Sequence, residues 1–113
     1  MTVKEFLARY DAGENFNVRS LEDIFYLDFE EDEDDICQIV EEEYDEPDRW
    51  TRPHTRWVNI NGRYFEVNRQ EALTELQDNE YWQQPQEVIC TQVTRTIVVI
   101  ENQYTYIERE VKQ

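Results

Sequence analysis

The residues of this sequence that could do chemistry are carboxylates, and most of them are crowded into one stretch. Between Glu22 and Asp48 there are fifteen Asp or Glu residues and no Lys or Arg, and the six residues from Glu30 to Asp35 are all acidic. Adjacent carboxylates repel one another and attract cations, so the chemistry offered here is the display of negative charge. Such a stretch is either a solvated face that keeps the protein soluble or a surface that binds a basic partner.

A nucleic-acid mimic is the sharper of these two interpretations. Carboxylates at alternate positions of a strand repeat at about 6.8 Å, and those four positions apart on a helix lie roughly 6 Å apart. Both spacings are similar in scale to successive phosphates of a nucleic-acid strand, and a row of them can occupy a basic groove. The candidate partner-binding residues are Glu30, Glu31, Asp32, Glu33, Asp34, Asp35, Glu41, Glu42, Glu43, Asp45 and Glu46. The mimic and the solvated face both stay open at this point.

Composition indicates a folded protein whose charge is concentrated in one half. The 113 residues carry 27 acids and 11 bases, for a net charge of −16, yet 39% are hydrophobic and 13% aromatic. Residues 1–50 have a net charge of −14 and residues 51–113 of −2. We therefore expect a single domain with an acidic helical part (1–48) and a β-rich part (49–113).

This charge predicts the class of partner. An acidic surface repels nucleic acid and anionic membranes and attracts basic protein surfaces, so we expect a basic protein partner, no direct contact with nucleic acid and no membrane. The N-terminus lacks the apolar core of a signal peptide, which favours a cytosolic or nuclear protein.

Five arginines between Arg49 and Arg69 are interspersed with Trp50, Trp57 and Tyr64, as in single-strand binders. In so acidic a chain we expect them to pair with the acidic half or to stack on the tryptophans.

No catalytic constellation is evident. His54 is the single histidine, has no serine or cysteine beside it, and is expected at the surface. Cys37 and Cys90 form no CxxC unit, which argues against zinc and for two buried or partly buried thiols. The two glycines, Gly13 and Gly62, fit no phosphate loop, and the acidic run does not fit a calcium-binding loop. We expect no enzyme activity, no metal and no cofactor.

Helices are predicted in the N-terminal half. Thr2 and Glu5 have the spacing of a capping box before a helix over 3–11, and Ser20 is placed to cap a second short helix. The acidic run itself should be a loop or a frayed helix start. For 36–44, helical spacing of the apolar residues favours a helix, although a strand is the alternative.

The clearest local structure is a hairpin over 55–67. Asn61-Gly62 between two β-prone runs is typical of a type I′ turn, whose register would pair Ile60 with Arg63, Val58 with Phe65 and Arg56 with Val67. That face should be the core face. The opposite face, with Trp57, Asn59, Tyr64 and Glu66, should be half exposed.

The remaining elements complete an α+β fold. We expect a short helix over 68–79, a central strand over 87–101 and an edge strand over 104–107. The prediction is of N-terminal helices packed on a mostly antiparallel sheet that contains the 55–67 hairpin.

Two resemblances bear on function. The runs Val58–Val67, Leu73–Tyr81 and Gln84–Val88 resemble a segment of small uncharacterised proteins of phages and mobile genetic elements of Gram-positive bacteria. Size and acidity are similar to those of anti-CRISPR proteins, which as a group share no fold or residues. The resemblance implies a non-catalytic Cas9 inhibitor in the cytoplasm of a bacterial host cell, blocking either guide RNA loading or DNA binding.

Two other classes remain as alternatives. One is an adaptor or structural protein of a mobile element, which would bind a protein partner through the aromatic face of Trp57 and Tyr64. The other is a metal-dependent nuclease that uses paired carboxylates.

Overall fold

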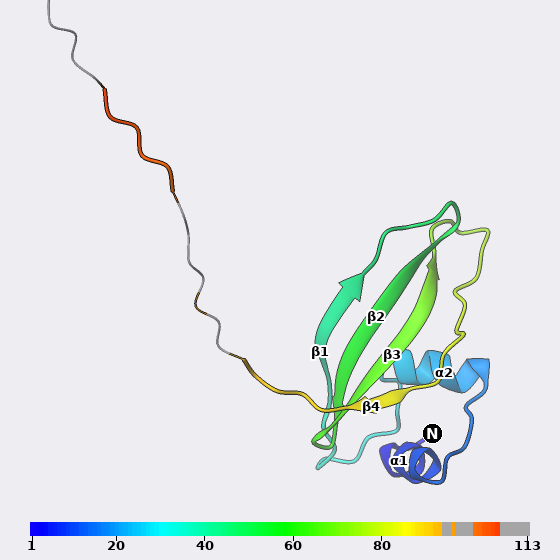
Figure 1. Cartoon of the computed structure of the whole chain (residues 1–113). Helices are drawn as coiled ribbons and strands as arrows, with labels where there is room; N and C mark the ends of the chain where they lie inside the picture. The colour runs from blue at the N-terminus through cyan, green and yellow to red at the C-terminus, as the bar shows by residue number, and fades with distance from the viewer. Residues whose placement is uncertain (94–95, 97–100, 107–113) are drawn as a thin grey trace, which may run out of the picture.

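A computed structural model describes residues 1–93, 96 and 101–106. Two helices precede a four-stranded antiparallel sheet whose strands lie in chain order, β1-β2-β3-β4 (Figure 1). The elements are α1 (Val3–Asp11), α2 (Val18–Phe25), β1 (Cys37–Tyr44), β2 (Thr51–Ile60), β3 (Arg63–Ala72) and β4 (Gln86–Val88). The expected α+β fold, with N-terminal helices on an antiparallel sheet, is confirmed.

Both predicted N-terminal helices form, with one difference in capping. Thr2 caps α1 as expected, because its hydroxyl oxygen accepts a hydrogen bond from the Glu5 amide at 3.1 Å. The cap of α2 is Asn17, not Ser20, and its side-chain oxygen accepts a hydrogen bond from the Ser20 amide at 2.9 Å. The helix therefore begins earlier than predicted, since asparagine caps a helix as well as serine does.

The hairpin prediction is confirmed in turn and register. Ile60 pairs with Arg63, Val58 with Phe65 and Arg56 with Val67. Asn61 and Gly62 have φ angles of 51° and 84°, as a type I′ turn requires. The hairpin is also longer than predicted, because β2 starts at Thr51 and β3 ends at Ala72.

The helix favoured for 36–44 is wrong, because Cys37–Tyr44 is the edge strand β1. It pairs with β2 from Cys37 opposite Ile60 to Tyr44 opposite His54, with a bulge at Val40. Pairing with β2 outweighs the weak helical spacing of the apolar residues, and it places Glu42 opposite Arg56, where its carboxylate meets the cationic side chains of β2.

Three predictions for the C-terminal half also need correction. The helix over 68–79 is wrong, since 68–72 completes β3 and 73–85 forms an irregular connection. In the part of 87–101 that is described, only residues up to Val88 belong to a strand, and β4 lies at the edge of the sheet. Residues 104–106 form no strand. The Ile97–Ile100 run and Ile107, on which the other part of these predictions depended, lie outside the described residues.

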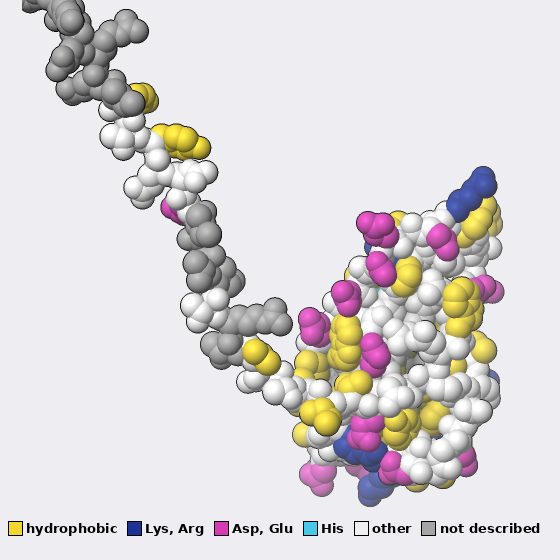
Figure 2. Space-filling view, in the orientation of Figure 1, with side chains coloured by type: hydrophobic (Ala, Val, Ile, Leu, Met, Phe, Trp, Pro, Cys, Tyr) yellow, Lys and Arg dark blue, Asp and Glu magenta, His cyan; other side chains and the backbone are white. Residues whose placement is uncertain are grey.

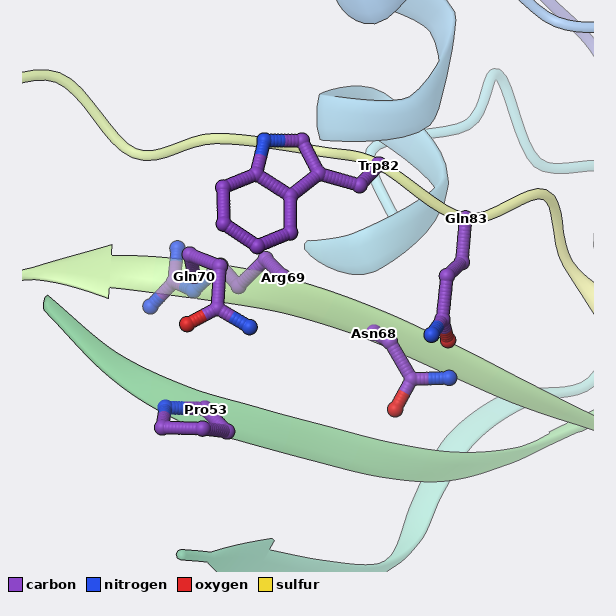
Figure 3. Close-up of a pocket in the computed structure, with 6 residues that line it drawn as sticks. All are labelled: Pro53, Asn68, Arg69, Gln70, Trp82 and Gln83. Carbon is purple, nitrogen blue, oxygen red and sulfur yellow. The ribbon is translucent and has the colours of Figure 1, made fainter. Parts of the chain in front are cut away.

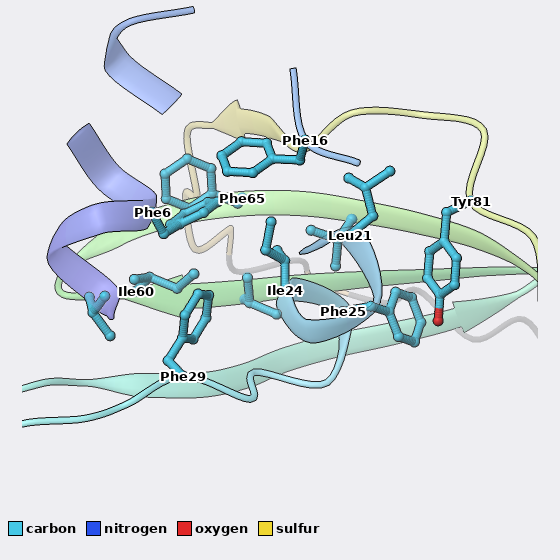
Figure 4. Packing of buried hydrophobic residues seen from close by; sticks show 12 residues of the cluster. Phe6, Phe16, Leu21, Ile24, Phe25, Phe29, Ile60, Phe65 and Tyr81 are labelled. Atoms are coloured by element: carbon cyan, nitrogen blue, oxygen red, sulfur yellow. The ribbon is translucent and has the colours of Figure 1, made fainter. Parts of the chain in front are cut away.

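The core lies between the helices and one face of the hairpin (Figure 4). Phe6 is fully buried and its ring lies 5.1 Å from that of Phe65, edge to face, and 5.5 Å from those of Phe16 and Phe29. The buried hydrophobic residues are Val3, Phe6, Phe16, Leu21, Ile24, Phe25, Phe29, Val58, Ile60, Phe65, Val67 and Tyr81. This aromatic packing fixes the helices against the sheet and leaves β1 at the open edge.

Candidate functional site: the acidic edge of the sheet

The acidic run forms a turn that is attached at both ends. At its start, the Glu30 amide donates to the Met1 carbonyl at 3.1 Å, and Glu30 forms a β-bridge with Thr2. At its end, the Asn61 side chain accepts a hydrogen bond from the Ile36 amide at 2.7 Å and donates one to Asp35 at 3.0 Å. Residues 30–36 are therefore held against α1 and the hairpin turn.

The turn also has internal order. The Asp32 amide donates to a carboxylate oxygen of Asp35 at 2.9 Å, and the Asp35 amide donates to the Asp32 carbonyl at 3.0 Å. The hydrogen bonds from Asn61 and from the Asp32 amide hold the pKa of Asp35 below its usual value. Asp35 is thus a structural carboxylate that remains ionised.

The other members of the turn are exposed and carry free charge. All five residues from Glu30 to Asp34 are exposed. Within the described part of the chain, none of them forms a salt bridge. The repulsion among these side chains does not break the turn, because the turn is held by backbone hydrogen bonds and by the Asn61 side chain.

Strand β1 extends the acidic row and divides its glutamates between two faces. Glu41 lies opposite Trp57 and Glu43 opposite Thr55, both on the face of the sheet away from the helices. Glu42 lies opposite Arg56, on the face that packs against the helices. Glu41 and Glu43 are exposed and make no salt bridge to any described residue, so only these two add to the displayed charge.

Glu42 instead connects β1 to a buried cationic cluster. One of its carboxylate oxygens lies 3.0 Å from His54 Nε2 and also accepts a hydrogen bond from Arg56 Nε. The hydrogen bond from Arg56 lowers the pKa of Glu42, and the hydrogen bond from His54 lowers it further by a smaller amount. Its charge is largely neutralised within the molecule, which separates it from the other candidate partner-binding residues.

His54 is buried, not at the surface as expected. Its side chain is 1% exposed, and its ring stacks on Tyr44 at 4.0 Å and meets Phe25 edge to face at 4.9 Å. Burial lowers the pKa of His54, although the hydrogen bond to Glu42 opposes that shift. The neutral ring donates through Nε2 to Glu42 and leaves Nδ1 without a partner in the described structure.

Phe25 of α2 lies at the centre of this cluster. The guanidinium carbons of Arg56 and Arg69 lie 4.4 Å and 4.3 Å from the centroid of its ring, and Arg56 also donates to the Phe25 carbonyl at 2.9 Å. Arg69 is only 6% exposed and donates to the Tyr26 hydroxyl. These contacts join α2, β1, β2 and β3, so the cluster positions the acidic edge.

The hairpin arginines are therefore largely used inside the molecule. Arg52 pairs with Glu71, and Arg63 pairs with both Asp11 and Glu87. The expectation that arginines pair with acids is met, although two of these acids, Glu71 and Glu87, belong to the C-terminal half. Stacking on tryptophan is limited among the described residues to Arg49, which lies 4.8 Å from the Trp50 ring centroid.

Further carboxylates follow β1 in its connection to β2. Asp45 and Glu46 are exposed there. The Asp48 carboxylate accepts hydrogen bonds from the backbone amides of Thr51 and Trp50, which lower its pKa. Acidic side chains thus lie before, along and after β1, and Figure 2 shows carboxylates distributed along this edge of the sheet among apolar side chains.

An open hollow of about 370 Å³ lies near this end of the sheet. Trp50 and Trp82, which are 51% and 70% exposed, both line it. The carboxylates of Asp48, Asp78 and Glu80 line it too. Aromatic rings beside carboxylates suit a cationic side chain better than an anionic one.

The outer face of the sheet carries two smaller hollows. One, of about 230 Å³, is lined mainly by apolar side chains, including Val40, Trp57, Tyr64 and Val88. The other, of about 110 Å³, is lined by Pro53, Asn68, Arg69, Gln70, Trp82 and Gln83 (Figure 3). Neither contains a histidine with a nucleophile.

The two cysteines are free thiols that differ in burial. Cys37 is half-buried, as predicted, and burial raises its pKa to about 12, whereas Cys90 is exposed, contrary to prediction. Within residues 1–93, 96 and 101–106, no three His, Cys, Asp or Glu side chains are gathered so as to hold a metal ion. None of the described helices is long and apolar enough to cross a membrane.

Sequence reasoning identified the acidic residues but missed the cluster that positions them. His54 and Arg69 share a face with Val58 and Phe65, which the alternation of the hairpin would have shown had it been continued beyond Thr55 and Val67. Pro53 lies within that continuation, and proline is a weak signal for a strand.

Comparison with known proteins assigns no relative. No protein-family model, no curated protein and no solved structure matches the chain. A function for it must therefore be argued from its own residues.

Proposed function

We propose that this protein is a non-catalytic inhibitor that uses its acidic edge as a nucleic-acid mimic. The edge would occupy a basic groove of a nucleic-acid-handling enzyme of the bacterial cytoplasm. Cas9 is the first candidate target, because it holds its guide RNA and its target DNA in positively charged channels. The protein would then prevent guide loading or DNA binding.

The observation that carries this proposal is the attachment of the acidic turn at both ends. A flexible acidic tail loses conformational entropy on binding, whereas a turn held by Asn61 and by the Thr2–Glu30 bridge is already ordered. Its four exposed carboxylates from Glu31 to Asp34 are continued by Glu41 and Glu43 along β1. An ordered row of charge is a better competitor for a phosphate site than the same charge dispersed.

The internal use of the arginines supports the same conclusion. Arg52, Arg56 and Arg63 are paired with Glu71, Glu42, Asp11 and Glu87, none of which belongs to the acidic turn. Among the described residues, Arg56 neutralises only Glu42 of β1, whereas Glu41, Glu43 and the turn residues Glu31 to Asp34 have no salt-bridge partner, so most of the negative field of this edge is not cancelled. A field of one sign accelerates encounter with a surface of the opposite sign.

The second candidate function is that of an adaptor of a mobile element. It is favoured by the hollow on the outer face, where Trp57 and Tyr64 lie with Val40 and Val88. Binding through that face would depend weakly on salt and would be lost in Trp57→Ala. A nuclease has no comparable observation in its favour.

The test measures Cas9 binding to guide RNA, and Cas9–guide binding to target DNA, in the presence of the purified protein. We expect inhibition at one of these steps, with an inhibition constant that rises steeply with salt. Reversing two exposed charges in Glu31→Lys/Asp34→Lys should weaken inhibition by about tenfold or more, since each lost charge contact contributes roughly 1 kcal/mol. The matched control is Glu75→Lys/Glu101→Lys, which makes the same charge change on exposed residues that line none of the hollows described above.

The outcomes separate the two candidates. Equal effects of the two variants would show that net charge, not the acidic edge, is responsible. No inhibition of either step by the wild-type protein would remove Cas9, and salt-independent binding to whatever partner is recovered from a bacterial lysate would remove mimicry.

A further inference from the structure

The open side of β1 combines a free backbone edge with an alternating row of charge. In the described part of the chain, β1 pairs through one side alone, with β2. Of its eight residues all but Cys37 are exposed, including Ile39, Val40 and Tyr44 at 44%, 49% and 47%. A strand edge of this length is a template for another strand unless something protects it.

The direction of the free backbone groups follows from the pairing. Tyr44 lies opposite His54, and the amide of the next residue, Asp45, donates to the Pro53 carbonyl at 3.0 Å. The backbone N–H of Asp45 therefore points to β2. Hydrogen-bonding direction alternates along a strand, so the N–H and C=O groups of Glu41 and Glu43 point to β2. Those of Glu42 and Tyr44 point to the open side.

The side chains alternate in the complementary way. Glu42 and Tyr44 are fixed on the helix side, Glu42 by Arg56 and His54 and Tyr44 by stacking on His54 at 4.0 Å. Arg52 covers the Tyr44 ring at 4.1 Å. The segment from Glu41 to Tyr44 is therefore rigid, with two free backbone positions and two free carboxylates on the outer face.

This charge pattern selects among possible occupants. A second copy of the chain added antiparallel about Glu42 would place Glu41 opposite Glu43, Glu42 opposite Glu42 and Glu43 opposite Glu41. Like charges directly opposite one another are destabilising. A strand with basic residues at alternate positions would instead place them against Glu41 and Glu43, about 6.8 Å apart. The bulge at Val40 limits the continuous edge to this acidic half.

We propose that the Glu41–Tyr44 edge accepts an extended segment of a partner protein, with Lys or Arg at alternate positions, as an added β-strand. This inference rests on the proposed function in that both require a basic protein partner, and it names the segment by which that partner is held. The added strand would receive hydrogen bonds from the amides of Glu42 and Tyr44 and donate to their carbonyls. The outer-face carboxylates would select the basic residues.

The test uses a synthetic peptide in which lysine alternates with threonine and valine. Its effect on the full-length protein is followed by amide hydrogen exchange at each residue of β1. At saturating peptide, exchange at Glu42 and Tyr44 should slow by about tenfold or more, because a new hydrogen bond protects an amide. Glu41 and Glu43, which already bond to β2, should change little. The control peptide has the same composition with its lysines placed side by side.

Two charge variants complete the experiment. Glu41→Lys/Glu43→Lys should abolish peptide binding, and Glu75→Lys/Glu101→Lys should retain it. The inference is overturned if no peptide binds at millimolar concentration, if the control peptide protects the same amides equally, or if binding leaves Glu42 and Tyr44 exchanging as before. Protection of these amides with no competition against nucleic acid would refute the proposed function alone, and competition without protection would refute strand addition alone.

Discussion

At the residue scale, His54 determines how β1 is held. It is the point where the edge strand, through Glu42 and Tyr44, meets Phe25 and the cluster that contains the half-buried Arg56 and the buried Arg69. A neutral imidazole can donate to Glu42 without adding a third cation beside Arg56 and Arg69. Because burial, and after it Coulomb repulsion from those arginines, disfavours the protonated ring, acid should weaken this junction.

We predict that the stability of the fold decreases as the pH is lowered through a range set by His54. Its pKa in the folded protein lies below the usual 6.5. The unfolded chain therefore binds more protons as pH falls through 6.5, and the free energy of unfolding decreases. Above 6.5 both states are neutral at this position and the effect is absent. The paired carboxylates of Glu42 and Glu71, whose pKa values are also lowered, protonate in a separate range below their usual 4.5.

Urea unfolding at several pH values between 7 and 5 measures this effect. The His54→Gln variant keeps an amide donor for Glu42 but cannot take up a proton. Its free energy of unfolding should vary less with pH over this range than that of the wild-type protein. An identical slope in both proteins would assign the effect to another group.

The residue-scale predictions from sequence succeeded for charge and failed for burial. The acids from Glu30 to Asp34 are exposed because nothing apolar lies among them, which composition alone indicates. Sequence alone cannot tell that Glu42 is paired while Glu41 and Glu43 are free, because this depends on which face of the strand each side chain takes. A histidine and an arginine on a core face are exceptions to the rule that such residues stay at the surface, and they are stabilised by partners distant in sequence.

At the element scale, the hairpin turn has a second role as the anchor of the acidic turn. Asn61 adopts the positive φ that the turn requires, and its side chain bonds both Ile36 and Asp35. The same residue thus determines the register of β2 and β3 and the position of the candidate site.

We predict that Asn61→Gly separates these two roles. Glycine accepts the positive φ of the turn, so the hairpin should persist, while both hydrogen bonds to the acidic turn are lost. The expected loss of stability is about 1 kcal/mol, and the amide of Ile36 should exchange faster. Inhibition, or partner binding, should weaken although no charge has changed. Unaltered inhibition in this variant would argue that attachment of the turn is irrelevant to function.

The elements themselves were predictable to the extent that local signals agreed with long-range pairing. The α1 cap and the Asn61-Gly62 turn are local and were predicted correctly. The segments 36–44 and 68–72 have helical spacing, but they pair with opposite sides of β2, which becomes ten residues long on starting at Thr51. Tertiary pairing overrides weak local propensity, and a single sequence does not report it.

At the scale of the whole molecule, the charge of −16 protects an edge that would otherwise associate. Charged residues and bulges are the usual means by which edge strands avoid pairing with copies of themselves. In this protein the charged residues on the edge strand are Glu41 and Glu43, and the bulge is at Val40. The same charges that are proposed to attract a basic partner disfavour pairing of β1 with a second copy, so we expect any self-association to depend on pH.

We predict that the protein is monomeric at pH 7 and associates as the pH approaches its isoelectric point of about 4.2. Neutralised carboxylates no longer repel, and the exposed apolar residues of β1 can then contact one another. Light scattering during a pH titration should show the onset of association. Glu41→Gln/Glu43→Gln should move that onset to higher pH than Glu75→Gln/Asp78→Asn, although both remove two charges. If the two variants associate at the same pH, net charge alone controls association and the β1 edge has no special part in it.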